Sequence, residues 1–395
     1  MPYTTNLKGL GFAEPTIWRK VAEAMANIEK LVWDDPRVRD DLTRAEGVRQ
    51  LTRLIGGAMP VTMEMVDPHH PQFLQLLSTR VQWGLPSADC HYLWAPLHGD
   101  NTYRIVGDRG TARLFDIEIR ADTFAHLGDW RLHSRLGQVE TGPDNHVEVV
   151  LSRTRPEGAV NWVELPEGRC DIVLRQYFYD WDTEQMARLI IVNDNATYPP
   201  PPLSANTIRQ NLELLCDFLE QVPRVFRQSV EVYYQQQPNE MAFHAIEYGF
   251  NALTYGKGTY ACGPDEALIL EVPLPDTAYW NIQLASHFWE ARDFHLRQNA
   301  LNGHQAHVGS DGVFRAVIAH RDPGVANWLD AGGHTEGLIT IRYYEASETP
   351  IPTIRRVPLA ELDTALPADT PRVSAEQRQR ILRNRAWAMQ RLGRD

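Results

Sequence analysis

The chain contains the stretch Gly158-Ala-Val-Asn-Trp162 and repeats it, with its two middle residues exchanged, as Gly324-Val-Ala-Asn-Trp328. Each copy follows a proline and precedes a strand-like segment that carries an arginine, Arg175 in the first copy and Arg342 in the second. Proline, glycine and asparagine favour turns, so each copy is typical of a turn between strands. A signature that recurs in this way indicates two related β-domains in one chain.

The repeat extends outward on both sides of this signature. The further aligned pieces are Arg113–Ile119 with Ala278–Leu284, and Leu174–Tyr177 with Ile341–Tyr344. The first pair sets Phe115 opposite Trp280, Asp116 opposite Asn281, and Glu118 opposite Gln283. From that aromatic residue to the repeated asparagine the chain runs 46 residues in one copy and 47 in the other. Three matched pieces in one order at nearly constant spacing predict a duplicated domain.

The fold class follows from the many short strand-like segments in both copies. Segments such as Tyr103–Val106 and Cys170–Tyr179 are rich in β-branched and aromatic residues and are bounded by Gly, Pro, Asn and Asp. Short strands separated by turns are typical of sandwiches and jelly rolls. We therefore predict a mainly β protein with helical additions, built on two tandem, related jelly-roll or β-sandwich-like domains.

The helical additions set the domain boundaries. Apolar residues at helical spacing predict helices near the start, with a third, weaker one near 73–81. The run Tyr198-Pro-Pro-Pro-Pro-Leu203 is a stiff linker, and Ser374-Ala-Glu-Gln377 fits a capping box that begins a C-terminal helix. The predicted parts are a helical segment (1–89), the first β-domain (90–198), a Pro-rich linker and helix (199–240), the second β-domain (241–350) and a C-terminal extension with a helix (351–395).

Composition limits the class of partner. The chain has 395 residues, with 39 Lys and Arg against 51 Asp and Glu, which gives a formal net charge of −12. A phosphate surface attracts net positive charge, so we expect no nucleic-acid partner and no membrane partner. The four widely spaced cysteines are typical of reduced thiols in the cytoplasm. We also expect neither a secretory signal nor a membrane span.

Residues present in both copies are expected to serve the fold. We predict that Asn161 and Asn327 bond turn backbone and that Trp162 and Trp328 fill the sandwiches. The two repeated arginines are expected to pair with a buried carboxylate or with carbonyl groups. Residues that break the repeat are then the better functional candidates.

One such group is formed by His320, Asp322 and His334, which we take as catalytic candidates. A histidine near neutral pH beside a carboxylate can act as a general acid or base. The same residues could bind a metal or could simply cap strand ends. Their spacing matches no recognised ligand motif, and the chain has no nucleotide-binding fingerprint, serine-hydrolase elbow or zincin motif. We therefore expect no metal and no organic cofactor.

A second group has no counterpart in the other copy and lies at the entrance of a strand. It packs several polar side chains together, as binding sites do, although turn residues would give the same pattern. The substrate-binding candidates are His98, Asp100, Asn101 and Tyr103, together with Trp280 and Arg342 from the repeated segments.

The second copy resembles a known bacterial family. The matching stretches are Tyr279–Leu284, Asp311-Gly-Val-Phe314, Asp322–Leu329 and Gly337–Tyr344, and they are similar to the family catalogued as domain of unknown function 1214. Asp100-Asn-Thr-Tyr103 is more loosely similar to an element of its usual partner, domain of unknown function 1254, with Asp-Asn where that family has Asn-Asp. The resemblance implies jelly-roll-like domains and a tendency to form homo-oligomers, and it carries no established reaction.

Three functions are consistent with these features. The first is a cofactor-independent hydrolase or lyase acting on a small polar or aromatic metabolite, because β-scaffolds rich in Trp and Tyr often hold ligands in aromatic-lined concave faces. The second is a lectin-like protein that binds a carbohydrate or metabolite without catalysis. The third is a structural or assembly role based on the amphipathic terminal helices. The fold alone does not separate them.

Overall fold

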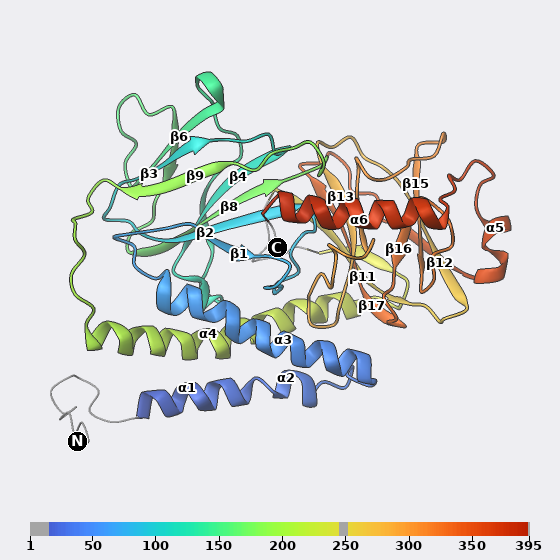
Figure 1. Cartoon of the computed structure of the whole chain (residues 1–395), viewed down its shortest axis with the longest axis horizontal. Coiled ribbons are helices and arrows are strands. Elements are labelled where there is room, and N and C mark those ends of the chain that lie inside the picture. The colour runs from blue at the N-terminus through green and yellow to red at the C-terminus, as the bar shows by residue number, and fades with distance from the viewer. Residues whose placement is uncertain (1–15, 245–251, 394–395) are drawn as a thin grey trace.

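The structure is a computed structural model that describes residues 16–244 and 252–393. Two β-domains lie side by side along the long axis, with helices α1, α3 and α4 beneath them (Figure 1). Each domain is a sandwich of one five-stranded sheet and one four-stranded sheet. The prediction of a mainly β protein with two related sandwich domains is confirmed.

The two sandwiches have the same topology. In the first domain the five-stranded sheet has the order β1 (Leu74–Leu77), β2 (Cys90–His98), β8 (Arg169–Tyr177), β4 (Leu114–Ala121) and β5 (Leu132–Leu136). Its four-stranded sheet has the order β7 (Asn161–Glu164), β6 (His146–Ser152), β3 (Tyr103–Asp108) and β9 (Arg188–Asn193). In the second domain the five-stranded sheet has the order β10 (Met241–Phe243), β11 (Leu253–Ala261), β17 (Glu336–Tyr344), β13 (Trp280–Ala285) and β14 (Ala300–Asn302). Its four-stranded sheet has the order β16 (Trp328–Asp330), β15 (Val313–Ala319), β12 (Glu266–Pro273) and β18 (Thr353–Pro358). Each four-stranded sheet has its one parallel pair at the same place, β6 with β7 and β15 with β16.

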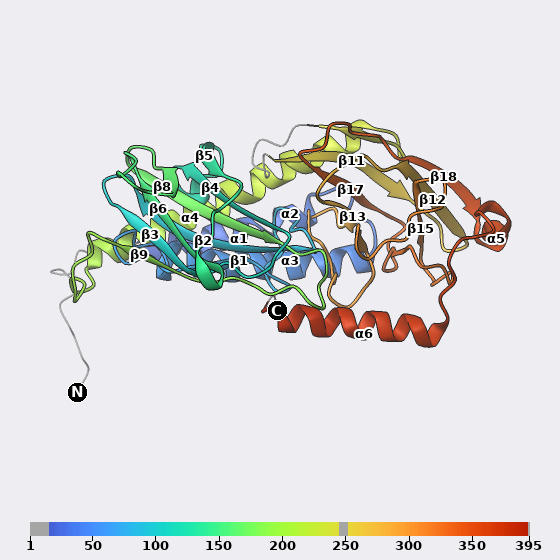
Figure 2. The ribbon, with the colours of Figure 1, turned by 90° about the horizontal axis from the view of Figure 1, so that it is seen from above.

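The helices cover the sandwiches from two sides. They are α1 (Thr16–Asn27), α2 (Lys30–Trp33), α3 (Asp41–Met59), α4 (Ala205–Glu231), α5 (Leu362–Ala365) and α6 (Ala375–Arg391). The predicted capping box of α6 is present, with Ser374 and Gln377 bonding reciprocally, and α6 lies along the second domain (Figure 2). Within the described ranges, no helix combines the length and the apolar composition needed to cross a membrane.

One expected helix is a strand. Residues 74–77 form β1, the edge strand that pairs antiparallel with β2, where we expected a third helix near 73–81. The backbone of β1 finds its hydrogen bonds on β2, and this tertiary pairing outweighs the weak helical propensity of the segment.

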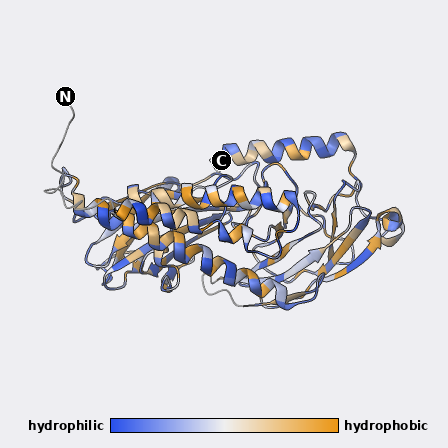
Figure 3. Ribbon diagram, turned by 90° about the horizontal axis from the view of Figure 1, so that it is seen from below, coloured by the Kyte–Doolittle hydropathy of each residue, from blue (hydrophilic) through white to orange (hydrophobic). Residues whose placement is uncertain are grey.

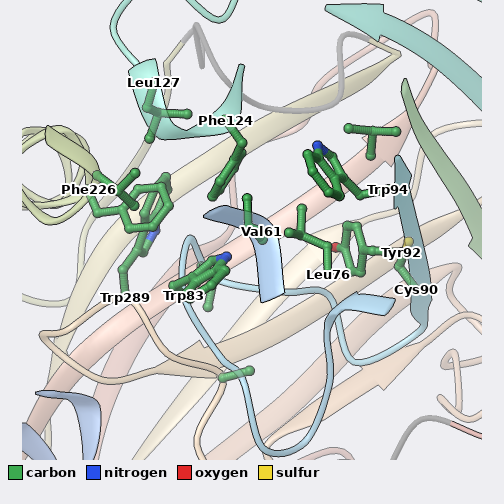
Figure 4. Packing of buried hydrophobic residues seen from close by; sticks show 14 of the residues in the cluster. Val61, Leu76, Trp83, Cys90, Tyr92, Trp94, Phe124, Leu127, Phe226 and Trp289 are labelled. Carbon is green, nitrogen blue, oxygen red and sulfur yellow. The ribbon is translucent and has the colours of Figure 1, made fainter. Parts of the chain in front are cut away.

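Both faces of each five-stranded sheet are buried. One face packs on the four-stranded sheet of its own domain. The other face packs on an apolar layer that lies between the sheets and the helices and is shared by both domains. We call this shared layer the central layer; it contains Trp83, Tyr92, Trp94, Phe124, Phe218 and Trp289 among its members (Figure 4). The helices seen from below carry hydrophobic and hydrophilic residues together (Figure 3), and α4 buries one apolar stripe that includes Leu212, Leu215, Phe218, Leu219 and Val222.

The repeated asparagines do the same work in the two domains. The side chain of Asn161 accepts from the backbone N–H of Glu140 and donates to the carbonyls of Glu140 and Glu148. Asn327 does the same with the N–H of His307 and the carbonyls of His307 and Arg315. Each amide thus ties the start of β7 or β16 to an adjacent loop and to its neighbouring strand.

We expect Asn161→Ala and Asn327→Ala to destabilise the protein by similar amounts, about 2–4 kcal/mol each. Each substitution removes three hydrogen bonds and leaves buried backbone groups without a partner. The free energy of unfolding, measured with urea, checks this. Asn206→Ala, on the exposed side of α4, is the control and should change it by less than about 0.5 kcal/mol; a similarly small effect at both repeated positions would contradict the structural role.

A buried carboxylate holds part of the central layer. Asp171 on β8 is fully buried, and its Oδ2 accepts from the Phe124 N–H at 2.7 Å and from the Trp130 indole N–H at 3.1 Å. Burial raises the pKa of Asp171 from 3.8 to about 7, although these hydrogen bonds oppose the shift.

This raised pKa predicts a pH-dependent stability. Between about pH 4 and pH 7 the folded protein holds a proton on Asp171 that the unfolded chain releases, so the contribution of Asp171 to stability falls as the pH rises through this window. We expect Asp171→Asn to gain stability relative to the wild type between pH 5 and pH 8, by about 1–3 kcal/mol. Urea unfolding at several pH values measures the difference, and parallel profiles for the two proteins would show that Asp171 is not the cause.

Candidate functional site

The central layer encloses a cavity of about 90 Å³ between the two five-stranded sheets. Its apolar wall includes Trp83, Leu85, Phe124, Phe226 and Trp289, four of which are drawn in Figure 4. Tyr92, Tyr233 and Tyr255 add phenol groups, and Arg175 and Arg342 add two guanidinium groups. Apolar pockets with a few converging polar groups are the usual form of small-molecule sites, most of which are larger than this cavity.

The two arginines are the repeated arginines of the sequence. Arg175 lies on β8 beside Tyr92 of β2, and Arg342 lies on β17 beside Tyr255 of β11, at the same register in the two sheets. Their exposed fractions are 6% and 3%. The duplication therefore places one buried cation on each side of the same cavity.

Arg175 has a carboxylate partner. Its Nη1 lies 2.6 Å from Oε2 of Glu118 on β4, which also accepts from Arg120 at 2.7 Å. Burial alone would raise the pKa of Glu118, but the two arginines outweigh it and lower that pKa. Burial likewise opposes the charge of Arg175, and Glu118 raises the pKa of Arg175 above its ordinary value. This half of the cavity thus carries a formed ion pair.

Arg342 has only neutral partners in the described part of the chain. Its Nη1 donates to Oδ1 of Asn281 at 3.2 Å and to Oε1 of Gln283 at 3.3 Å. Its Nη2 donates to the carbonyl of Leu85 at 3.2 Å. Asn281 and Gln283 occupy the positions of Asp116 and Glu118 in the first domain, so amides stand where the other copy has acids. Among the described residues no ion pair compensates the charge of Arg342.

The hydrogen bonds from Arg342 continue into the domain interface. The Asn281 amide donates to the carboxylate of Asp89 at 2.8 Å, and Gln283 bonds the backbone of Pro86 and Ala88. Asp89 is also bonded by the Tyr279 hydroxyl at 2.7 Å. The side chains of Asn281 and Gln283 on β13 thereby connect the loop before β2 to the second domain by hydrogen bonds.

Two cavity residues have a backbone conformation that side chains rarely adopt. Leu85 has φ 51° and Trp289 has φ 59°, and the Leu85 N–H donates to the Trp289 carbonyl at 2.7 Å. Left-handed backbone at bulky residues costs of order 1–3 kcal/mol each and gathers at binding sites. The Trp289 indole donates to Tyr233, whose hydroxyl is bonded to Thr340 at 2.8 Å. Trp289 is thus held by hydrogen bonds at both its backbone and its side chain.

The three catalytic candidates each contact a different part of the fold. His320 Nε2 lies 2.8 Å from the carbonyl of Cys262, and Asp322 accepts from Arg378 of α6 at 3.0 Å. His334 Nε2 lies 3.1 Å from Glu46 of α3. The contacts of the three in the described structure thus lead to a strand end, to α6 and to α3, and a catalytic role for them stays a prediction.

The binding candidates of the first domain form a turn around one hydroxyl. The Tyr103 hydroxyl accepts from the His98 N–H at 2.9 Å and from the Asn101 amide at 3.0 Å, and it donates to the Pro68 carbonyl. Asp100 lies at the exposed tip, 3.5 Å from His98. Trp280 is buried in the core of the second domain, where it packs on Phe314. Of all the predicted site residues, Arg342 is the one that lines the central cavity.

Sequence reasoning missed Arg175, Leu85, Tyr255 and the other walls of the cavity. One signal was available, because the alignment of the copies sets Asp116 and Glu118 opposite two amides while it keeps the arginine. The remaining walls come from loops and helices that meet only when the domains dock. In the described chain no group of three or more His, Cys, Asp or Glu side chains is placed to hold a metal ion.

Comparisons with known proteins agree with this duplicated architecture. Residues 94–179 and 259–348 both match the family model described as "Protein of unknown function (DUF1214)", so the segment around Asp100–Tyr103 matches the same model as the second copy. No curated protein sequence matches the chain.

Two solved structures are similar over most of their length. An uncharacterized protein from Burkholderia cenocepacia aligns with a TM-score of 0.83 and 29% identity, over 88% of this chain and 98% of that one. The VPA0106 protein from Vibrio parahaemolyticus aligns with a TM-score of 0.47 and 10% identity, over 77% of this chain and 96% of that one. The chain thus contains two segments that match the DUF1214 family model, one in each β-domain, which is consistent with a DUF1214 protein that carries a repeated domain.

Proposed function

We propose that the protein binds a small carboxylate in the central cavity and that Arg342 is the cation that anchors it. The observation that carries this proposal is a buried arginine that faces an apolar cavity and has only neutral acceptors among the described residues. Its counterpart in the first domain, Arg175, has a carboxylate at 2.6 Å.

The energetics favour an anionic ligand. Burying a charge without an opposite charge costs several kcal/mol even after relaxation, whereas neutral acceptors satisfy hydrogen bonds and leave the charge in place. A ligand carboxylate would accept two parallel N–H groups from a guanidinium, which is the strongest common arrangement of this kind. In the first domain the buried charge of Arg175 is compensated by the carboxylate of Glu118.

The size and lining of the cavity narrow the ligand class. A cavity of about 150 Å³ can bind benzene, so a space of about 90 Å³ suits a smaller molecule of only a few heavy atoms. The aromatic and aliphatic walls favour an apolar tail on the carboxylate. A carbohydrate would need many more donors and acceptors than these walls offer, so the geometry favours the carboxylate over a lectin-like function.

We expect Arg342→Met to weaken the binding of propionate about 10- to 100-fold, because it removes a charge-assisted hydrogen-bonded pair. Isothermal titration calorimetry measures the affinity, with propionamide as the neutral ligand of matched shape. Arg378→Met is the matched control. Arg378 of α6 is similarly buried and bonds Gln298, Asp322 and the Val325 carbonyl, none of which lines the cavity. Equal affinity for propionate and propionamide would refute the proposal.

A second variant tests the charge directly. Gln283→Glu would recreate beside Arg342 the acid that Glu118 supplies beside Arg175, so the internal carboxylate should displace the ligand. We expect Gln283→Glu to bind propionate at least about 10-fold more weakly than Gln283→Met. Both variants lose the amide donor to the Pro86 carbonyl, and Gln283→Glu alone keeps an acceptor for the Ala88 N–H. Equal affinities would mean that Arg342 does not select the anion.

A further inference from the structure

A lysine lies on the same sheet face as Arg342. Lys257 of β11 is opposite Thr340 of β17 in the register, and Tyr255 is opposite Arg342 two residues along. Side chains directly opposite share a face, and so do residues two apart on one strand. Lys257 and Arg342 are therefore diagonal neighbours, for which the usual separation is about 7–8 Å.

The environment of Lys257 is apolar. Its exposed fraction is 2%, and its Nζ lies 5.7 Å from the centroid of the Tyr233 ring. Tyr233 lines the cavity, so Lys257 lies behind this wall and is not itself a lining residue. In the described chain the amine has no hydrogen-bond or ion-pair partner. Burial lowers the pKa of Lys257 from 10.5 to about 8, and His244 and Tyr233 are the titratable groups that face it.

The repeat shows that the fold does not require a lysine at this position. Because Arg175 corresponds to Arg342, the residue that corresponds to Lys257 is Trp94 of β2, which lies opposite Val173. The first domain thus fills the same place with an apolar pair, and Trp94 is fully buried. A buried amine without a partner, at a position where the other copy has a tryptophan, indicates a chemical role.

We propose that Lys257 forms an imine with a small oxo acid whose carboxylate is held by Arg342. This inference rests on the proposed function and names its ligand class. The nitrogen lone pair attacks the carbonyl carbon, and the two hydrogens of the neutral amine leave with the carbonyl oxygen as water. The step needs no oxidant and no cofactor, and a desolvated lysine is the usual amine for it.

The test is reductive trapping on the full chain with glyoxylate and cyanoborohydride, followed by peptide mass mapping. The chain has only four lysines, and the exposed Lys20 and Lys30 serve as internal controls. We expect the secondary amine to form first at Lys257. Its rate should rise between pH 6 and pH 8 and then level off, whereas the rate at an exposed amine should keep rising toward pH 10.

Two variants make the outcome specific. Lys257→Met should abolish the fast adduct, and thermal unfolding checks that this variant is folded. Arg342→Met should slow trapping by glyoxylate about 10-fold without slowing trapping by acetaldehyde, which has no carboxylate. Glyoxylate modification at Lys257 no faster than at Lys20 would overturn the inference, and so would equal effects of Arg342→Met on the two aldehydes.

The two proposals fail in different ways. If propionate binds through Arg342 but glyoxylate leaves Lys257 unmodified, the imine is wrong and the carboxylate site stands. If neither propionate nor glyoxylate binds in the wild type, both proposals are wrong.

Discussion

A sheet buried on both faces has to satisfy every polar side chain inside the protein, and this constraint governs the structure. In the five-stranded sheets these polar side chains lie on the faces that point toward the central layer. In the first domain that face carries Glu118 and Arg175, which form an ion pair at 2.6 Å. In the second it carries Gln283 and Arg342, where the same geometry is kept and the negative charge is missing. The two faces therefore differ in charge balance, and our proposal places the ligand at the face that lacks the carboxylate.

The polar rows also hold the domains together. Asn281 and Gln283 of β13 bond the loop that precedes β2 of the other domain. Asp89 in that loop accepts from Asn281 of the second domain and from the Trp181 indole of the first. A polar interface of this kind needs every partner in place, since an unmade bond in a buried network is costly. The cavity is lined by residues of both domains and is complete only when they are docked, and the strained Leu85 is held at their junction.

Much of the architecture could be predicted from the sequence because it depends on local pattern. The duplicated signature, the alternating strands and the capping box at Ser374 all act over a few residues. The strand β1 could not be predicted, because its hydrogen bonds are made with another strand, β2, and not within the segment. The cavity could not be predicted for the same reason, since Trp83, Phe226 and Tyr255 converge only through docking.

Recurrence in both copies does not by itself separate residues that serve the fold from residues that bind a ligand. Residues shared by both copies were expected to serve the fold, and for Asn161 and Asn327 that holds. Arg342 is shared as well, yet what distinguishes it is its neighbours, which changed from acids to amides. A duplicated domain can keep a residue for structure in one copy and free it for binding in the other. The informative comparison is then between the partners of a repeated charge, and here they leave Arg342 as the cation that an incoming carboxylate would complete.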